Sequence, residues 1–315
     1  MTNILLTSAS RKVSLVKNFK KALNNNGKII AMDISTQSPA LYFADEYIIG
    51  LRSDNPEFIN FMIETCKNND IKLIIPTRDE ELALFSKNRK LFEDIGTQIM
   101  VSDLKAIETC QNKEKFIEFC QNNNFDIPKT FDNASQITDK DFPLFLKPIV
   151  GKGGSETFKV DSREELNSIL SNSNDFLIQE FIDYPEYTID LFADFDGNVI
   201  SAVPRQRVNV WGGESLVTKT VKNQILIDEA IKLAEKLELK GHNTIQCFFD
   251  GKNIIKFIEV NPRFGGAASI SFEAGANSAE FLLKLLDGET LKPQIGEFKD
   301  DLTSLRYVED YFIED

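Results

Sequence analysis

A carboxylate, an amide and a guanidinium follow one another at two-residue spacing near the end of the chain. Glu259 and Asn261 are two residues apart in the apolar run 257–261, which predicts a strand with both side chains on one face. A carboxylate and an amide oxygen suit Mg²⁺, a hard cation that prefers oxygen ligands. Arg263 can hold a phosphate through its planar fork of donors. The alternative is a strand that ends in a Pro turn with solvated polar residues.

A second segment joins a lysine to a glycine-rich loop. Lys147 ends an apolar run that predicts a strand, and the loop that follows contains Gly151, Lys152, Gly153, Gly154 and Ser155. Glycines let backbone amides approach phosphate oxygens closely. The Walker pattern is absent because no GKS or GKT ends the loop before a helix. An ordinary glycine-rich hairpin loop is the alternative.

A third segment, residues 178–190, predicts a strand, a short linker and a further strand. A backbone carbonyl at such a strand edge can accept the adenine amino group, and Glu186 can accept the ribose hydroxyls. The alternative is an ordinary strand, turn and strand without a ligand.

Two arginines and a polar turn lie between these segments. Arg205 and Arg207, together with Glu214 and Ser215, are candidates for a substrate pocket, because arginine forks suit a carboxylate or a phosphate. A solvated hairpin is the alternative. For His242, the only histidine, we expect a phosphate-side or structural role in preference to general base catalysis.

The elements that must position these residues differ between the two halves of the chain. Residues 1–109 alternate apolar runs with helical patterns, which predicts a small parallel α/β layer. GxGxxG is absent from its first turn, so we expect a scaffold whose strand ends help to form a substrate cleft. Beyond Pro128 the strands occur in antiparallel-looking runs with intervening helices, which predicts an α+β second half.

Composition restricts the classes of partner. With 315 residues, two or more packed subdomains are expected. The 36 basic and 49 acidic residues give a formal charge of -13, which opposes a sequence-independent grip on nucleic acid or anionic lipid. Neither a membrane-spanning apolar stretch nor a signal-peptide pattern occurs, so a cytoplasmic protein is expected. The four widely spaced cysteines are expected to be reduced packing residues.

Joined in this order, the segments resemble the ATP-grasp superfamily, and within it the single-module proteins similar to one half of the carbamoyl-phosphate synthase large subunit. The resemblance includes residues 6–15, 40–49 and 76–82, which look like parts of the family's N-terminal domain, and 112–115, which resembles the opening of its nucleotide-binding part. It implies a parallel pre-ATP-grasp domain at 1–109, then a two-subdomain ATP-grasp fold, small at 110–178 and large at 179–315.

The resemblance also implies roles for individual residues. Phosphate or adenine-side contacts fall on Lys113 and Lys147, the phosphate loop on 151–155, adenine contacts on Glu180, Phe181 and Ile182, the ribose contact on Glu186, magnesium on Gln246, Glu259 and Asn261, and the transferred phosphoryl group on Arg263. Two departures occur. Residues 183–185 replace the usual glycine before Glu186, and Gln246 is a neutral amide where many members carry a carboxylate.

The function that the resemblance implies is ligation. A small carboxylic acid attacks the γ-phosphate of ATP with Mg²⁺, or Mn²⁺ as an alternative, and an amine, ammonia or a thiol captures the acyl phosphate. Neither nucleic acid nor membrane is an expected partner, whereas a homodimer is compatible with the family. Two alternatives remain open: a small-molecule kinase that releases a phosphorylated product, and a nucleotide-binding module without turnover.

Overall fold

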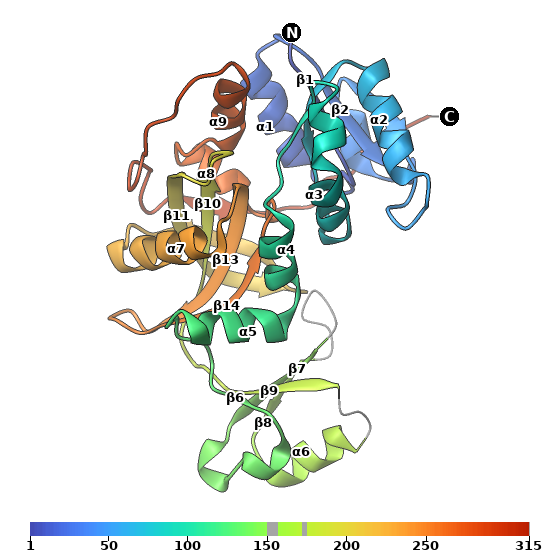
Figure 1. Cartoon of the computed structure of the whole chain (residues 1–315). Helices are drawn as coiled ribbons and strands as arrows, with labels where there is room; N and C mark the ends of the chain where they lie inside the picture. Colours follow the sequence, from blue (N-terminus) through green and yellow to red (C-terminus); the bar gives the residue numbers. More distant parts are fainter. Residues whose placement is uncertain (150–156, 172–174, 315) are drawn as a thin grey trace.

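The computed structural model describes residues 1–149, 157–171 and 175–314, and three β-sheets organise them (Figure 1). A parallel sheet lies at the N-terminal end, a six-stranded antiparallel sheet lies beside it, and a four-stranded sheet forms a separate small lobe at the bottom of Figure 1. Helices α4 (Leu104–Gln111) and α5 (Lys113–Asn122) carry the chain from the parallel sheet toward the lobe.

The parallel sheet has the strand order β3-β2-β1-β4-β5. Its strands are β1 (Asn3–Leu6), β2 (Ile29–Asp33), β3 (Glu46–Ile49), β4 (Ile71–Ile75) and β5 (Gln98–Ile99). Its helices are α1 (Val13–Leu23), the short η1 (Pro39–Phe43), α2 (Phe58–Asn68) and α3 (Asp79–Glu93). Ile4 and Leu6 pack with α1 on one face, and Leu5 packs with α2 and α3 on the other. Burial on both faces explains why these strands read as unbroken apolar runs.

The small lobe is an antiparallel sheet of order β6-β9-β7-β8 with one helix against it (Figure 1). Its elements are β6 (Thr130–Phe131), the turns η2 (Ala134–Gln136) and η3 (Asp139–Asp141), β7 (Leu144–Pro148), β8 (Phe158–Val160), α6 (Arg163–Leu170) and β9 (Phe176–Glu180). Leu144, Leu146, Val160, Leu166 and Ile178 form its own core. A separate core allows the lobe to be treated as one packed unit.

The six-stranded sheet has the order β14-β13-β10-β11-β12-β15. Its strands are β10 (Glu186–Ala193), β11 (Val199–Trp211), β12 (Glu214–Thr220), β13 (Gly241–Phe249), β14 (Ile255–Asn261) and β15 (Thr303–Leu305), accompanied by α7 (Gln224–Leu237), α8 (Ser269–Glu273) and α9 (Ser278–Leu286). One face, with Ile189, Ile245 and Cys247, packs in a core with α7 residues such as Leu233. Side chains alternate between faces, so Thr188, Gln246 and Glu259 share the opposite, polar face.

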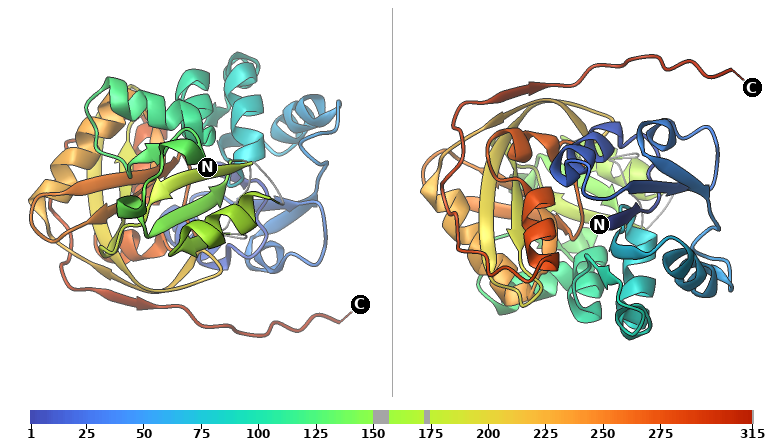
Figure 2. Two further views of the ribbon diagram at one scale, coloured as in Figure 1. Left: turned by 90° about the horizontal axis from the view of Figure 1, so that it is seen from below. Right: turned by 90° about the horizontal axis from the view of Figure 1, so that it is seen from above.

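Most predicted elements are found, and β11 differs most from its prediction. The apolar run of this strand ends at Val203 in the sequence, whereas β11 continues through Arg205 and Arg207 to Trp211 and pairs with β12 along this extension. Trp211 is 76% exposed. Three polar residues, 205–207, interrupt the apolar run, and the apolar residues beyond them are exposed, so the sequence pattern indicates a shorter strand than the structure has. The chain then finishes with β15 and an extended segment that crosses the molecule (Figure 2).

Candidate active site

Glu259 lies at the centre of a group of polar side chains on the polar face of the six-stranded sheet. It pairs with Gln246 across β13 and β14, and Asn261 follows two residues later on β14. The Gln246 amide donates to Glu259 Oε1, and Asn261 Nδ2 donates to the same oxygen at 2.9 Å. The structure thus brings the three predicted metal ligands into one contact group.

Arg263 connects this group to the parallel sheet. Its guanidinium donates through Nε and Nη2 to the two carboxylate oxygens of Asp79, each at 2.8 Å, and through Nη2 to Asn261 Oδ1 at 3.2 Å. Asp79 is the first residue of α3 and follows β4 closely. Both side chains are mostly buried, at 20% and 13% exposure. A two-point contact of this kind fixes the plane of the guanidinium.

Arg207 and Glu186 extend the group toward β11 and β10. Arg207 Nη1 donates to Gln246 Oε1 at 2.8 Å, and its Nε lies 3.2 Å from Glu186 Oε1. Burial raises the pKa of Glu186 and lowers that of Arg207, while each partner's charge acts in the opposite direction. We use the name polar cluster for Glu186, Arg207, Gln246, Glu259, Asn261 and Arg263.

Two lysines approach the polar cluster from the other side. Burial lowers the pKa of Lys147 to about 8, the charge of Lys113 lowers it further, and Glu259 opposes both. Within residues 1–149, 157–171 and 175–314, the ammonium group of Lys147 has neither a hydrogen-bond nor an ion-pair partner. Lys113 Nζ donates to the Pro148 carbonyl, and burial lowers its pKa as well. A half-buried cation without a counter-ion within ion-pair distance favours an anionic ligand.

The predicted adenine segment joins the small lobe to β10. The Glu180 side chain accepts from Lys256 Nζ at 2.5 Å and from the Lys129 amide at 2.7 Å, so it ties β9 to β14. Lys159 lies 4.9 Å from the centre of the Phe181 ring. No acceptor in the described ranges meets the backbone N–H of Ile182.

The remaining predicted residues lie deeper, further out or outside the described residues. Arg205 is buried, with Nε donating to Asp190 Oδ2 at 2.9 Å. Glu214 forms ion pairs with Arg11 and Arg306, and Ser215 is buried beside it. The predicted phosphate loop, with Gly151, Lys152, Gly153, Gly154 and Ser155, falls outside the described residues.

His242 lies in a buried packing position. Its ring stacks on Phe264 with 4.2 Å between centroids, and Nδ1 lies 2.9 Å from Ser278 Oγ. Nε2 is 4.0 Å from Asp190 Oδ1, and burial lowers the pKa of His242 to about 4. A neutral, enclosed imidazole agrees with the predicted preference for a structural role over general base catalysis.

Sequence reasoning missed Asp79 and Lys12 as parts of this region. Asp79 holds Arg263, and the only available signal was its place directly after a strand end. Lys12 follows β1, and its Nζ donates to the Ser8 carbonyl at 3.2 Å. Burial, together with the charge of Arg263, lowers the pKa of Lys12 to about 8.

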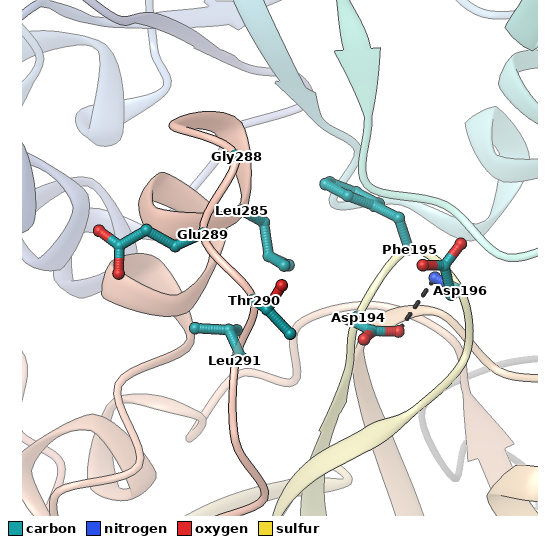
Figure 3. A pocket seen from close by; sticks show the side chains of 8 residues that line it. All are labelled: Asp194, Phe195, Asp196, Leu285, Gly288, Glu289, Thr290 and Leu291. Atoms are coloured by element: carbon teal, nitrogen blue, oxygen red, sulfur yellow. Dashed lines mark hydrogen bonds between the residues drawn. The ribbon is translucent and has the colours of Figure 1, made fainter.

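A small cavity of about 230 Å³ lies away from the polar cluster (Figure 3). It is bordered by the turn of Asp194 and Asp196 and by residues 285–291, which include the end of α9 and the segment that follows it. The Asp194 carboxylate already accepts from the backbone of Asp196 and Asn198. These hydrogen bonds stabilise the turn, so the Asp194 carboxylate has a structural role.

These observations define a class: a parallel α/β sheet joined to two antiparallel sheets, with Lys113 and Lys147 near Glu259 of the six-stranded sheet. Residues 4–100 match the family model "PylC-like, N-terminal domain", and residues 172–310 match "ATP-grasp in the biosynthetic pathway with Ter operon". The chain belongs to the ATP-grasp superfamily.

The similar proteins include ligases and carboxylases. The carbamoyl phosphate synthase large chain of Clostridium acetobutylicum is 25% identical over 298 residues, which cover 86% of this chain and 26% of that protein. The chain therefore spans about a quarter of the length of the curated relatives it matches. The biotin carboxylase domain of Hydrogenobacter thermophilus 2-oxoglutarate carboxylase, solved as a dimer with MgADP, ADP and bicarbonate, has a TM-score of 0.73 at 19% identity, covering 95% of this chain and 73% of that one.

L-amino acid ligase from Bacillus licheniformis has a TM-score of 0.70 at 19% identity, with coverage of 96% of this chain and 78% of that one. These structural likenesses establish the shared fold. Among the described helices, none is long and apolar enough to cross a membrane.

Proposed function

We propose that this chain is an ATP-dependent carboxylate ligase. It activates a small carboxylic acid as an acyl phosphate and transfers the acyl group to an amine, ammonia or a thiol, with release of ADP and phosphate. The observation that carries the proposal is Lys147, a half-buried cation that has no counter-ion within ion-pair distance among the described residues and whose pKa the charge of Glu259 raises. The family assignment supports the same reading, because carbon–nitrogen ligases share this fold.

The nucleotide binds between the small lobe and the six-stranded sheet. We assign the phosphates to Lys113, Lys147 and the loop 151–155, the adenine to residues 180–182, and the ribose to Glu186. The unused N–H of Ile182 suits a ring nitrogen acceptor. The Glu180 side chain is held by Lys256, so its backbone, not its carboxylate, serves the base. The proposed small subdomain, 110–178, contains most of the four-stranded lobe, and the proposed large one, 179–315, contains the six-stranded sheet; β9 runs across the boundary between them.

The donor set of the polar cluster fits a magnesium ion. Glu259 supplies a carboxylate, and Asn261 and Gln246 supply amides on the same face. Both amides donate to Glu259, so their nitrogens face the carboxylate and their oxygens face Arg263 and Arg207. Rotation of each amide would turn its oxygen toward a cation held by Glu259. Bound magnesium would neutralise charge on the β- and γ-phosphates.

The chain's own residues position the reactants. Arg263, oriented by Asp79, lies beside the metal-binding face and can stabilise the charge that develops on the transferred phosphoryl group. Lys147 approaches the phosphates from the lobe, and Arg207 offers a guanidinium at the side of β11. The carboxylate substrate attacks phosphorus in line, the bond to ADP breaks, and the acyl phosphate remains for the incoming nucleophile. No protein nucleophile takes part.

The test is a two-stage measurement with purified protein. Calorimetry first measures ATP binding with and without Mg²⁺. ADP release is then measured against pooled carboxylic acids, with and without pooled amines, followed by mass analysis of the product. Acid-dependent ADP release together with an amide or thioester supports a ligase. A stable phosphorylated product formed without a nucleophile assigns a kinase, and binding without ADP release assigns a non-catalytic module.

A further inference from the structure

A cavity of about 440 Å³ lies at the carboxyl edge of the parallel sheet, separate from the polar cluster. It is lined by Ser8 after β1, by Ile34 after β2, by residues 51–54 after β3 and by residues of the α3 segment after β4. In the sheet order β3-β2-β1-β4-β5, the strands that follow β1 in the chain, β2 and β3, lie on one side of it, and β4 and β5 lie on the other. The order of the strands therefore reverses between β1 and β4. Ligands of open parallel sheets bind in the crevice at such a point. The volume suits a small metabolite.

A buried carboxylate lies at the inner end of this cavity. Glu81 is 3% exposed and accepts hydrogen bonds from Thr7 Oγ1 at 2.7 Å and from Ser8 Oγ at 2.5 Å. No lysine or arginine of the described residues lies within ion-pair distance of it, and burial raises the pKa of its carboxyl group. Two neutral donors therefore hold a carboxylate whose charge has no direct partner.

The two arginines that line the cavity each lie beside a neighbouring carboxylate. Arg52 lies 3.2 Å from Asp54, and Arg78 lies 3.2 Å from Glu80, both pairs at the exposed rim. The charges of Arg78 and Lys12 act on Glu81 from beyond ion-pair distance and favour its ionised form, against the effect of burial. Apolar side chains complete the wall: Ile34, Leu51, Ala83 and Leu84. A carboxylate at the inner end and an apolar wall suit an organic ammonium with a hydrocarbon part.

The cavity adjoins the proposed reaction site through α3. Asp79 holds Arg263, and Glu81 follows two residues later in the first turn of the same helix. We propose that this cavity binds the second substrate of the ligase, a primary amine with an apolar portion, and that Glu81 recognises its ammonium group. This inference rests on the proposed ligase function and narrows the nucleophile to an amine.

Hydroxylamine separates the two halves of the reaction. It is small enough to reach an acyl phosphate without a binding pocket and converts it to a hydroxamate, so hydroxamate reports acid activation alone. Amide formation is measured in parallel with methylamine and isoamylamine. Ala83→Trp narrows the cavity from the half-buried side of α3, and Glu81→Gln removes the charge while keeping the shape. Lys87→Trp, at an exposed position outside the cavity lining, is the matched control.

We expect both cavity variants to raise the KM for isoamylamine at least tenfold while hydroxamate formation stays within twofold of wild type. Lys87→Trp should change neither. Loss of hydroxamate in folded Ala83→Trp and Glu81→Gln would assign the cavity to the acid and overturn the proposal. It is also overturned if wild-type protein forms hydroxamate but isoamylamine is neither coupled nor competes with hydroxylamine. A wild type that forms no hydroxamate from any pooled acid contradicts the ligase function itself.

Discussion

Lys147 is the residue on which nucleotide binding depends most directly. Its side chain is half-buried, and among the described residues its ammonium meets no counter-ion within ion-pair distance. We expect Lys147→Met to weaken MgATP binding by about 10- to 100-fold, because a hydrogen bond to a charged group contributes about 1.5–3 kcal/mol. Lys147→Arg should retain most of the affinity at neutral pH. Isothermal titration calorimetry measures both, and equal affinity for Lys147→Met and wild type would remove Lys147 from the site.

The pH dependence of MgATP binding tests the charge of Lys147. Because its pKa in the free protein is lowered to about 8, the protonated form that attracts phosphate is lost as the pH rises through that value. We expect MgATP affinity to fall between pH 8 and 10 in wild type. In Lys147→Arg the fall should become smaller, since the guanidinium stays charged over this range, while Lys113, whose pKa burial also lowers, is unchanged.

Glu259 and Asn261 test the metal assignment. Glu259→Gln keeps the size of the side chain but removes the only carboxylate among the three predicted ligands. We expect kcat to fall by about 10²-fold or more, while the unfolding temperature changes little, because Glu259 lies on the polar face and not in a core. Asn261→Ala should act in the same direction. Turnover at the wild-type rate in both variants would place the metal elsewhere.

At the scale of elements, the Arg263–Asp79 contact joins α3 of the parallel sheet to β14 of the six-stranded sheet. Asp79→Asn leaves a mostly buried guanidinium without its charged partner. We expect a loss of about 2 kcal/mol in the free energy of unfolding and a lower kcat, because Arg263 loses its orientation. Chemical denaturation measures the first effect. Asp54→Asn, which removes an exposed partner of Arg52, is the control and should stay within about 0.5 kcal/mol of wild type.

Apolar patterns predicted the elements that fill cores and missed those that do not. The runs at β1, β2 and β4 are buried on both faces, so their assignment needed no tertiary information. β12 and β15 carry polar or exposed residues, and only pairing with β11 and with each other defines them. The shared face of Glu259 and Asn261 was predicted because it depends only on their spacing of two residues along one strand. Asp79 was not assigned a role, since its partner Arg263 lies 184 residues away in the chain.

At the scale of the whole molecule, the only histidine controls part of the acid sensitivity. Burial lowers the pKa of His242 from 6.5 to about 4. Between these values the unfolded chain binds a proton that the folded chain does not, so stability falls as the pH drops. We expect a slope approaching 1.4 kcal/mol per pH unit between pH 6 and 5. His242→Asn should flatten it.

Two carboxyl groups change the stability in the opposite direction as the pH falls, so wild type has to be compared with His242→Asn under the same conditions. The raised pKa values of Glu81 and Glu186 mean that the folded protein takes up those protons first, which favours folding as the pH falls. They are unchanged in His242→Asn, so the difference between the two denaturation series isolates the histidine. An identical slope in the variant would contradict a buried, neutral His242.

The last prediction concerns the source of nitrogen. Glutamine hydrolysis by the common amidotransferase domains needs a cysteine activated by histidine or an N-terminal cysteine. Position 2 is Thr2. His242 contacts Ser278 and Phe264, and its low pKa makes it a poor base. Cys247, close in sequence, packs in the core on the opposite face from Gln246, as strand alternation predicts.

Burial also raises the pKa of all four cysteine thiols: Cys66, Cys110, Cys120 and Cys247. A thiol in an apolar setting stays protonated and is a weak nucleophile. We therefore expect that purified protein given ATP, acid and glutamine releases no glutamate, whereas ammonium or an amine supports turnover. Steady glutamate release that disappears in a single Cys→Ser variant would reverse this conclusion, because it would require one of these thiols to be an activated nucleophile.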